Sequence, residues 1–265
     1  MSHPPLFVPH GAPTFALRPG AAGAALVAAA QTLPPPRAII VLSAHWSSDV
    51  PTVGFAERPA TIHDFWGFPD ELYTLHYPAT GCPEASTEVV ATLSAAGLPV
   101  EQDAERGLDH GAWVPLRLMF PDAEVPVIPL SMPAHGGPLA AWQLGQALAP
   151  LIEQGFQIIA SGNLTHNLRD YQTAYRNGGQ TPAYVRQFTD WFAARLASHD
   201  TAALLDYRQQ APDARQAHPS DEHLLPFFVA LGAAGEQASA QRLHAGIDDY
   251  VIAMDAYAFL PQAGR

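Results

Sequence analysis

Two separate apolar runs near the start of the chain each end in a histidine. Residues 6–8 are followed by Pro9 and His10, and residues 38–44 are followed by His45. Short apolar runs are typical of buried strands, and a parallel sheet places the carboxyl ends of its strands at one edge, where α/β proteins bind their ligands. A histidine at that edge has a rigid backbone beneath it and open space in front. The pattern therefore predicts a metal site at the edge of a sheet.

Apolar runs alternate with helical patterns along the chain, which is typical of a layered α/β fold. The predicted strands are residues 6–8, 38–44, 52–55, 125–130, 156–160, 242–246 and 250–254. The predicted helices are residues 20–30, 113–120 and 184–196, and one that carries Leu144, Leu148, Leu151 and Ile152 on a single face. No low-complexity linker or repeat divides these elements. We therefore expect residues 1–265 to form a single domain.

The charge pattern excludes several classes of function. The 265 residues include 13 basic and 25 acidic ones, giving a net charge of −12, and no stretch gathers the basic residues. Nucleic acids and anionic membranes are poor partners for such a surface. Every basic residue is arginine, which excludes a Schiff-base lysine and a phosphate-loop lysine. Acid–base and ligand roles therefore fall to the 12 histidines.

The cysteine content bears on the cellular compartment. Cys82 is the only cysteine in the sequence, which excludes a disulfide framework and a thiolate zinc site. The first residues show no basic segment followed by a long apolar one, and the alanine-rich stretch 20–30 is too short to span a bilayer. We expect a cytoplasmic protein with no membrane partner.

A third histidine of interest, His223, comes just before an apolar helical pattern. Ser220 can cap that helix, and Asp221 and Glu222 suit its positive end. His223 is then in the first turn, where the helix dipole disfavours the imidazolium ion and keeps the ring in the neutral form that a metal requires. The position suits a metal ligand.

Two more histidines could face the same cavity. His166 follows the predicted strand 156–160 through a short loop, and it could serve as a base. His110 lies in a turn before the predicted helix 113–120, and Asp109 beside it could orient a neighbouring ring.

The other histidines have no predicted role in the site, and the aromatic residues are candidates for its walls. We expect surface or loop positions for His3, His76, His135, His199, His218 and His244, and an intermediate one for His63. The candidates for pocket walls, with core packing as an equal alternative, are Trp46, Phe65, Trp66, Phe68 and Trp113. The residue pattern alone leaves open whether the strand-end histidines bind a metal or are hydrogen-bonded structural residues.

Six motifs, spread over nearly the whole chain, resemble those of one enzyme family in the same order. They are Pro9-His10-Gly11-Ala12-Pro13, Leu42-Ser43-Ala44-His45-Trp46, Ile62-His63-Asp64-Phe65-Trp66-Gly67-Phe68-Pro69, Gly107-Leu108-Asp109-His110-Gly111-Ala112-Trp113, Ala160-Ser161-Gly162-Asn163-Leu164-Thr165-His166-Asn167-Leu168 and Glu222-His223-Leu224-Leu225-Pro226. On these motifs the chain resembles the extradiol ring-cleavage dioxygenases of the LigB type, and among them the DODA branch, the 4,5-DOPA extradiol dioxygenases.

The resemblance implies a three-layer α/β/α fold with a mixed, mostly parallel central sheet. It also implies one divalent metal per chain, iron(II) for activity or zinc in the isolated protein, and dioxygen as the co-substrate that opens a catechol ring to a semialdehyde. By motif, His10, His45 and His223 resemble the metal ligands. His166 resembles the catalytic acid–base residue, and His110 a further catalytic residue of the pocket.

One departure from the wider superfamily changes the charge of the site. The LigB-type enzymes first described use two histidines and a glutamate, and His223 takes the position of that glutamate. In this respect the chain resembles the DODA branch. Three neutral imidazoles leave the site one unit more positive than the two-histidine, one-carboxylate set usual for iron(II) oxygenases, and they suit zinc equally. Glu222 is expected to point elsewhere, since adjacent residues of a helix are about 100° apart.

Two other functions fit the same residues. A zinc-dependent hydrolase could use three histidines and a water molecule, and a non-catalytic binding protein would resemble the Memo type. Memo-like proteins would be expected to lose part of the histidine set, which this chain retains. The sequence does not determine which catechol is used or which bond is cleaved. It also leaves open whether the metal is iron or zinc, whether His166 is a ligand, and whether the protein is a monomer or a small homo-oligomer.

Overall fold

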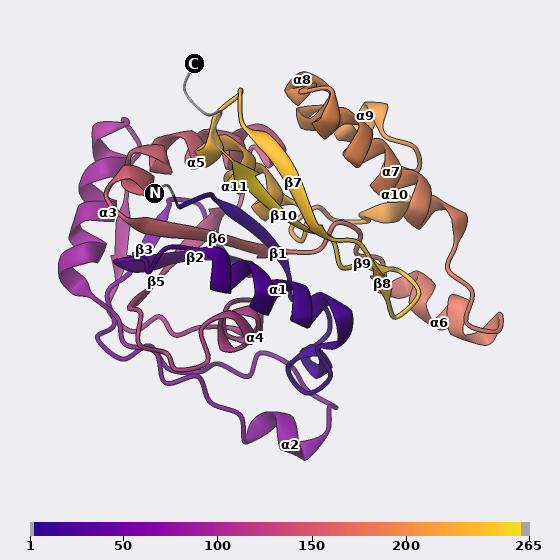
Figure 1. Ribbon diagram of the computed structural model, residues 1–265, viewed down its shortest axis with the longest axis horizontal. Helices are drawn as coiled ribbons and strands as arrows, with labels where there is room; N and C mark the ends of the chain where they lie inside the picture. The colour runs from indigo at the N-terminus through magenta and orange to yellow at the C-terminus, as the bar shows by residue number, and fades with distance from the viewer. Residues whose placement is uncertain (1–2, 261–265) are drawn as a thin grey trace.

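The computed structural model describes residues 3–260, which are built around one eight-stranded sheet (Figure 1). The strand order is β4-β3-β5-β2-β6-β1-β10-β7. The central strands β5, β2, β6 and β1 are parallel, whereas β3 joins β5, and β10 joins β1 and β7, in antiparallel pairs. The strands of this sheet are β1 (Leu6–Pro9), β2 (Ala38–Ser48), β3 (Thr52–Gly54), β4 (Glu101–Asp103), β5 (Val127–Pro133), β6 (Phe156–Gly162), β7 (Ser239–His244) and β10 (Ala256–Leu260).

Helices cover both faces of the sheet. In β2, Ile40 and Leu42 belong to one buried cluster, and Ile39 and Val41 to the other, as the two-residue period of a strand requires. The helices of the first cluster are α3 (Pro83–Ala95), α5 (Gly137–Glu153), α7 (Ala183–Ala197) and α11 (Leu225–Ala234), and those of the second are α1 (Gly20–Thr32) and α4 (His110–Met119). The expected three-layer α/β/α architecture with a mixed sheet is confirmed.

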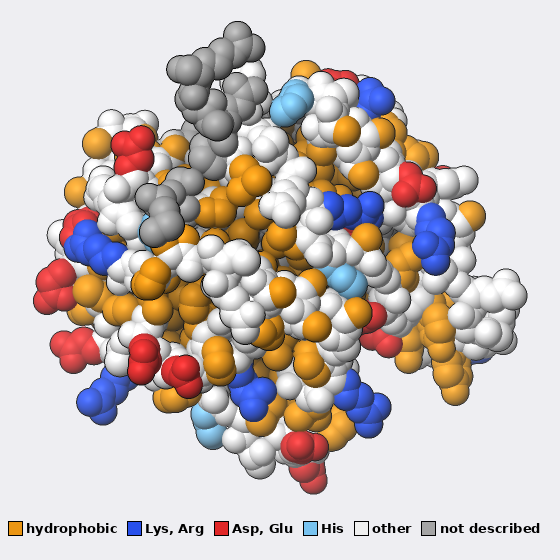
Figure 2. All heavy atoms as spheres, in the orientation of Figure 1, with side chains coloured by type: hydrophobic (Ala, Val, Ile, Leu, Met, Phe, Trp, Pro, Cys, Tyr) orange, Lys and Arg blue, Asp and Glu red, His pale blue; other side chains and the backbone are white. Residues whose placement is uncertain are grey.

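Short helices occupy the loops between these layers. They are η1 (Pro13–Ala16), α2 (Asp70–Tyr73), α6 (Leu168–Arg176), α8 (Thr201–Leu205), α9 (Tyr207–Gln210) and α10 (Ala214–Ala217). Among residues 3–260, no helix combines the length and the apolar character needed to cross a bilayer. On the face drawn in Figure 2 the arginines are dispersed among acidic and apolar side chains, in agreement with the charge pattern of the sequence.

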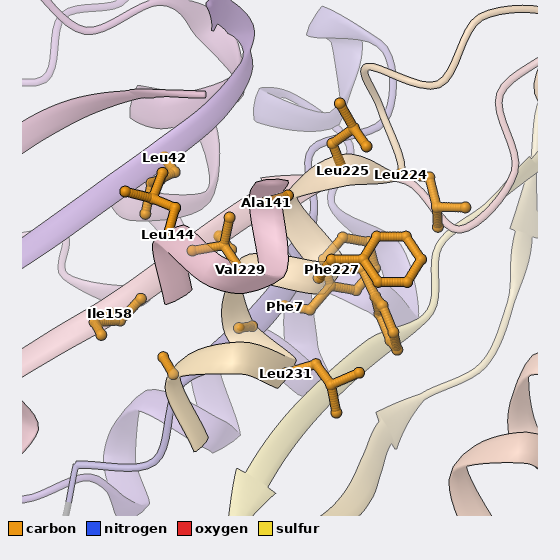
Figure 3. Packing of buried hydrophobic residues seen from close by; sticks show 14 of the residues in the cluster. Phe7, Leu42, Ala141, Leu144, Ile158, Leu224, Leu225, Phe227, Val229 and Leu231 are labelled. Carbon is orange, nitrogen blue, oxygen red and sulfur yellow. The ribbon is translucent and has the colours of Figure 1, made fainter. Parts of the chain in front are cut away.

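The core beneath α5 and α11 fixes two of the segments that carry predicted site residues (Figure 3). Phe227 of α11 meets Phe7 of β1 edge to face, with 5.4 Å between the ring centres, and Leu144 of α5 belongs to the same buried cluster. Because β1 leads directly to His10 and α11 directly follows the turn that holds His223, this packing holds both backbones in place.

Helices α5 and α11 touch backbone to backbone at two glycines. A Cβ atom on Gly145 would lie 2.1 Å from the carbonyl oxygen of Val229, and one on Gly232 would lie 2.1 Å from that of Trp142. We expect Gly145→Ala to lower the free energy of unfolding by about 1–3 kcal/mol, because the helices must move apart. Urea unfolding checks this, with exposed Gln146→Ala on the same helix expected within about 0.5 kcal/mol of the unsubstituted protein. An equal stability of both variants would contradict the close contact.

The carboxyl-terminal strands differ from the prediction. Of the predicted strand 250–254, only Ile252–Ala253 (β9) is extended, and it pairs with Ile247–Asp248 (β8) in a separate two-stranded sheet. The strand that joins the main sheet is β10, which is buried on both faces up to its last residue and has no alternating pattern to reveal it. Strand β4 is three polar residues at the sheet edge and carries no apolar signal at all.

Candidate metal centre

Three histidines from distant parts of the chain meet at the carboxyl edge of the sheet. His10 follows β1, His45 lies in the last part of β2, and His223 lies in a turn before α11. Their ring centres form a nearly equilateral triangle with sides of 5.0, 5.2 and 4.9 Å. The Nε2 atoms of His10 and His45 are 3.2 Å apart. Two nitrogens that share one tetrahedral zinc would be about 3.4 Å apart, so the spacing fits a common ion.

A hydrogen-bond chain sets the tautomer of His10. The hydroxyl of Ser161 donates to the carbonyl oxygen of Gly111, so its oxygen is free to accept a hydrogen from His10 Nδ1, 2.9 Å away. With the proton on Nδ1, the Nε2 atom of His10 carries a lone pair. Asn163 stands beside that atom, with its Nδ2 at 3.4 Å, while its Oδ1 accepts from the backbone N–H of Gly11. In this tautomer the buried ring could donate to a metal through Nε2.

His223 is oriented by its own neighbour, which corrects two expectations. Its Nδ1 donates to Glu222 Oε1 at 3.1 Å, so Glu222 does not point elsewhere. The reason is that residues 222–224 form a turn and α11 begins only at Leu225, so the helical angle between neighbours does not apply. Ser220 does not cap a helix either, because its hydroxyl donates to the same Glu222 oxygen.

Asp64 supports the other side of the cluster, and the residue pattern did not single it out. It accepts from the backbone N–H of His110 at 2.8 Å and from His110 Nδ1 at 3.0 Å, and its Oδ2 lies 3.6 Å from His45 Nδ1. Burial acts to raise the pKa of Asp64, but the hydrogen bonds from His110 and the electrostatic attraction to its ring outweigh it and lower the pKa to about 2. The carboxylate therefore stays ionised beside two imidazoles. Its only sequence signal was its place in a family motif.

Asp109 has a different role from the one expected. It is the N-cap of α4, which begins at His110 rather than at Trp113, and it accepts from the backbone N–H of Ala112. It also accepts from the hydroxyl of Ser43 at 2.5 Å and pairs with Arg106. Because these groups occupy its oxygens, Asp109 fixes the start of the helix that carries His110, whereas Asp64 holds the ring.

His166 lies face to face with His223. The two rings are nearly parallel, at 8°, with 3.5 Å between their centres. The backbone N–H of His166 donates to the carbonyl oxygen of Ala217, which ties the loop after β6 to the segment before His223. The stacking keeps the ring of His166 at the wall of the cluster and outside the triangle of the other three.

Burial keeps these rings neutral near pH 7. It lowers the pKa of His10 well below its usual value, with the neighbouring His45 adding to the effect. Burial and then His110 lower the pKa of His45 to about 3, and burial and then His223 lower that of His166 to about 2. The pKa of His223 is lowered chiefly by burial, and the ring lies in a turn before α11 rather than in the first turn of the helix, where it was expected. Neutral imidazole is the form that binds a metal.

The cluster contains more potential ligand atoms than one metal ion needs. Two groups have ligand atoms within 4.8 Å of one another: His10, His45 and His110 in the first, and His166, Glu222 and His223 in the second. The predicted set of His10, His45 and His223 spans both groups. The structure therefore brings all five predicted site histidines together.

A cavity of about 570 Å³ opens in front of the cluster. Its walls include His45, His110, His166 and His223, and on the apolar side Phe65, Trp66, Phe68 and Leu168. Three of the five predicted aromatic wall residues therefore line it. Trp46 instead lies under the guanidinium of Arg106, and Trp113 is buried with its Nε1 donating to the carbonyl oxygen of Ile62. The size and the mixed walls suit a small aromatic ligand.

Two histidines expected at surface or loop positions lie in loops but are buried. His218 is fully enclosed, and its Nε2 lies 2.9 Å from the carbonyl oxygen of Leu164 in the loop that leads to His166. His3 is also buried. The rings of Phe188 and Tyr207 also pack against His218, and a local hydrophobic pattern does not record such tertiary contacts.

The fold and the site define a class of protein, an α/β enzyme with neutral imidazole donors beneath an aromatic-walled cavity. The family model described as "Catalytic LigB subunit of aromatic ring-opening dioxygenase" matches residues 1–259. The chain belongs to this LigB family, and it is a metal-dependent ring-opening dioxygenase of the extradiol type. The resemblance drawn from the six motifs is thereby confirmed.

Individual relatives agree with this membership. The "4,5-DOPA dioxygenase extradiol" of Beta vulgaris is 40% identical over 225 residues, which are 84% of this chain and 83% of the relative. The protein of the same name from Escherichia coli K12 is 38% identical over 240 residues, 87% of this chain and 84% of the relative. The crystal structure of an uncharacterized E. coli K12 protein is similar with a TM-score of 0.79 and 29% identity, over 96% of this chain and 98% of that one.

Proposed function

We propose that residues 1–265 form a single catalytic domain that holds one divalent metal through His10, His45 and His223 and opens the ring of a DOPA-like catechol to a semialdehyde. The observation that carries this is the triangle of three neutral imidazoles directly below the cavity. We propose iron(II) as the active metal, although three nitrogen donors accept zinc as well. The cytoplasmic location and the oligomeric state stay predictions.

In the proposed reaction the metal activates the catechol and dioxygen, and the protein transfers protons. Iron(II) held by His10, His45 and His223 would supply Lewis acidity and redox chemistry for the reaction of a catechol with dioxygen. Two protons must leave the hydroxyl groups as the catechol binds, and the neutral ring of His166 can accept one of them while the other passes to solvent water. The same imidazole can return that proton when the catechol ring opens, which is general base and then general acid catalysis. The negative charge of a bound catecholate beside His166 would raise the pKa of this imidazole from its low value.

His110 has a second role in the proposal. Its Nδ1 donates to Asp64, and in the neutral form of the ring its Nε2 carries a lone pair. That atom can accept a hydrogen bond from a catechol hydroxyl and so orient the ring. Phe65 and Phe68 provide the apolar wall against which the ring lies and from which water is excluded.

The test is oxygen consumption by iron-loaded protein. Protein loaded without air is mixed with DOPA, protocatechuate and caffeate, and air is then admitted. We expect one dioxygen per ring opened and the coloured semialdehyde. If the protein retains iron but consumes no oxygen with any catechol, the dioxygenase proposal fails. A zinc-loaded sample that hydrolyses esters or amides without oxygen would favour the hydrolase alternative instead.

A further inference from the structure

The β8–β9 hairpin brings a second carboxylate to the cavity. Asp249, at its tip, is one of the residues that line the cavity. Both Asp249 and the next residue, Tyr250, have positive φ angles, of 48° and 63°. Positive φ angles are usual in the tight turn of a β-hairpin, and they set the direction in which the side chain of Asp249 leaves the tip.

Contacts on both sides of the tip hold the hairpin in place. Tyr250 stacks on Tyr171 of α6, with 6.1 Å between ring centres and 21° between the planes. The hydroxyl of Thr165 donates to the carbonyl oxygen of Val251 at 2.8 Å and accepts from the backbone N–H of Ala253 at 2.9 Å. Since Thr165 immediately precedes His166, the loop that carries the proposed acid–base residue also anchors the hairpin.

The charges around the cavity are of one sign. Among the described residues that line it, Asp64 and Asp249 are the acidic ones, and none is arginine or lysine. Asp64 is occupied by His110 and His45. Asp249 is exposed to solvent, and among the contacts of residues 3–260 no side-chain hydrogen bond or ion pair engages its carboxylate. Partial burial raises the pKa of Asp249 from its usual value. A carboxylate without a partner at the mouth of a ligand cavity favours a positively charged group there.

We propose that Asp249 is a specificity-determining residue that binds a cationic substituent, an ammonium group on the side chain of a catechol. The inference rests on the proposed function and adds the class of substrate. The cavity of about 570 Å³ has room for a substituent beyond the aromatic ring. Catechols whose only charge is a carboxylate meet like charge at the mouth and are disfavoured.

The test compares four catechols that differ in the charge of the side chain. Dopamine carries an ammonium group, DOPA both an ammonium and a carboxylate, 4-methylcatechol no charge, and dihydrocaffeate a carboxylate alone. For the iron-loaded protein we expect kcat/KM for dopamine to exceed that for 4-methylcatechol by about tenfold, as for one charge-assisted hydrogen bond at a partly exposed site. Dihydrocaffeate is expected below 4-methylcatechol, and all differences shrink as salt is added.

The matched variants are Asp249→Asn and Asp248→Asn. Asparagine tolerates left-handed backbone, so the hairpin keeps its shape, and the ratio of dopamine to 4-methylcatechol is expected to fall to about one. Asp248, one residue earlier in β8, does not line the cavity, and its variant is expected to keep the ratio. An unchanged ratio in Asp249→Asn, or a preference for dihydrocaffeate, would overturn the inference.

A binding measurement separates this inference from the proposed function. Calorimetric titration of zinc-loaded protein without air gives the Kd for dopamine and 4-methylcatechol with no turnover, and Asp249→Asn is expected to weaken only the binding of dopamine. If 4-methylcatechol is cleaved but neither assay shows a preference for dopamine over 4-methylcatechol, the role of Asp249 is overturned. The dioxygenase proposal is unaffected by that result. Failure to cleave any of the four overturns the dioxygenase proposal itself.

Discussion

Substitution of His10, His45 or His223 by alanine is expected to abolish metal retention. Each variant removes one of three imidazole donors that lie about 5 Å apart. Loss of a residue that merely orients a ligand weakens metal binding by about 10- to 100-fold, so loss of a ligand itself is expected to exceed about 100-fold. The measurement is metal content per chain after dialysis, together with circular dichroism to verify the fold.

His135 provides the matched control. It is exposed and lies away from the cluster, so His135→Ala is expected to retain metal like the unsubstituted protein. If one of the three variants keeps a full complement of metal, the assignment at that position is wrong. His110 would then be the next candidate, because its ring centre is 4.1 Å from that of His45.

His166→Ala is expected to keep the metal and lose turnover. The ring of His166 stacks on His223 outside the triangle, so its removal takes away a proton carrier rather than a donor. General acid–base catalysis contributes about 100- to 10,000-fold, and we expect kcat to fall within that range. Metal content and kcat are measured on the same preparation, over a range of pH.

A second variant distinguishes proton transfer from support of His223. His166→Phe keeps an aromatic ring against His223 but cannot take up a proton, so it is expected to be as slow as His166→Ala. Turnover restored by phenylalanine would mean that stacking alone matters. Metal loss equal to that of the three ligand variants would mean that His166 is itself a ligand.

The apolar runs at residues 6–8 and 38–44 predicted β1 and β2 because a strand buried on both faces needs apolar residues at every position. The same runs predicted the positions of His10 and His45, since the end of each run is the end of the buried part of the strand. The helix through Leu144 was predicted by its apolar face in the same way. Strand β10 was missed because a neighbouring apolar segment, residues 250–254, competed for the same interpretation.

The residues that orient the rings were not predictable in this way. Ser161 lies 151 positions from His10, and Asp64 lies 46 positions from His110, so no local period connects them. Glu222 is adjacent to His223, yet it was expected to point away because the segment was interpreted as a helix rather than a turn. A hydrogen bond to a ring depends on the local backbone angle as much as on the residue type.

By itself the sequence determined the layered α/β class, the family and the five histidines of the site, because hydrophobic periodicity and short motifs are local properties. The tertiary structure alone decided which rings face one another, which hydrogen-bond partner sets the tautomer of each, and that Asp249 reaches the cavity from the far end of the chain. These depend on how strands and loops distant in sequence pack together. Burial, which keeps the imidazoles neutral, is likewise a property of the packed molecule and not of any residue alone.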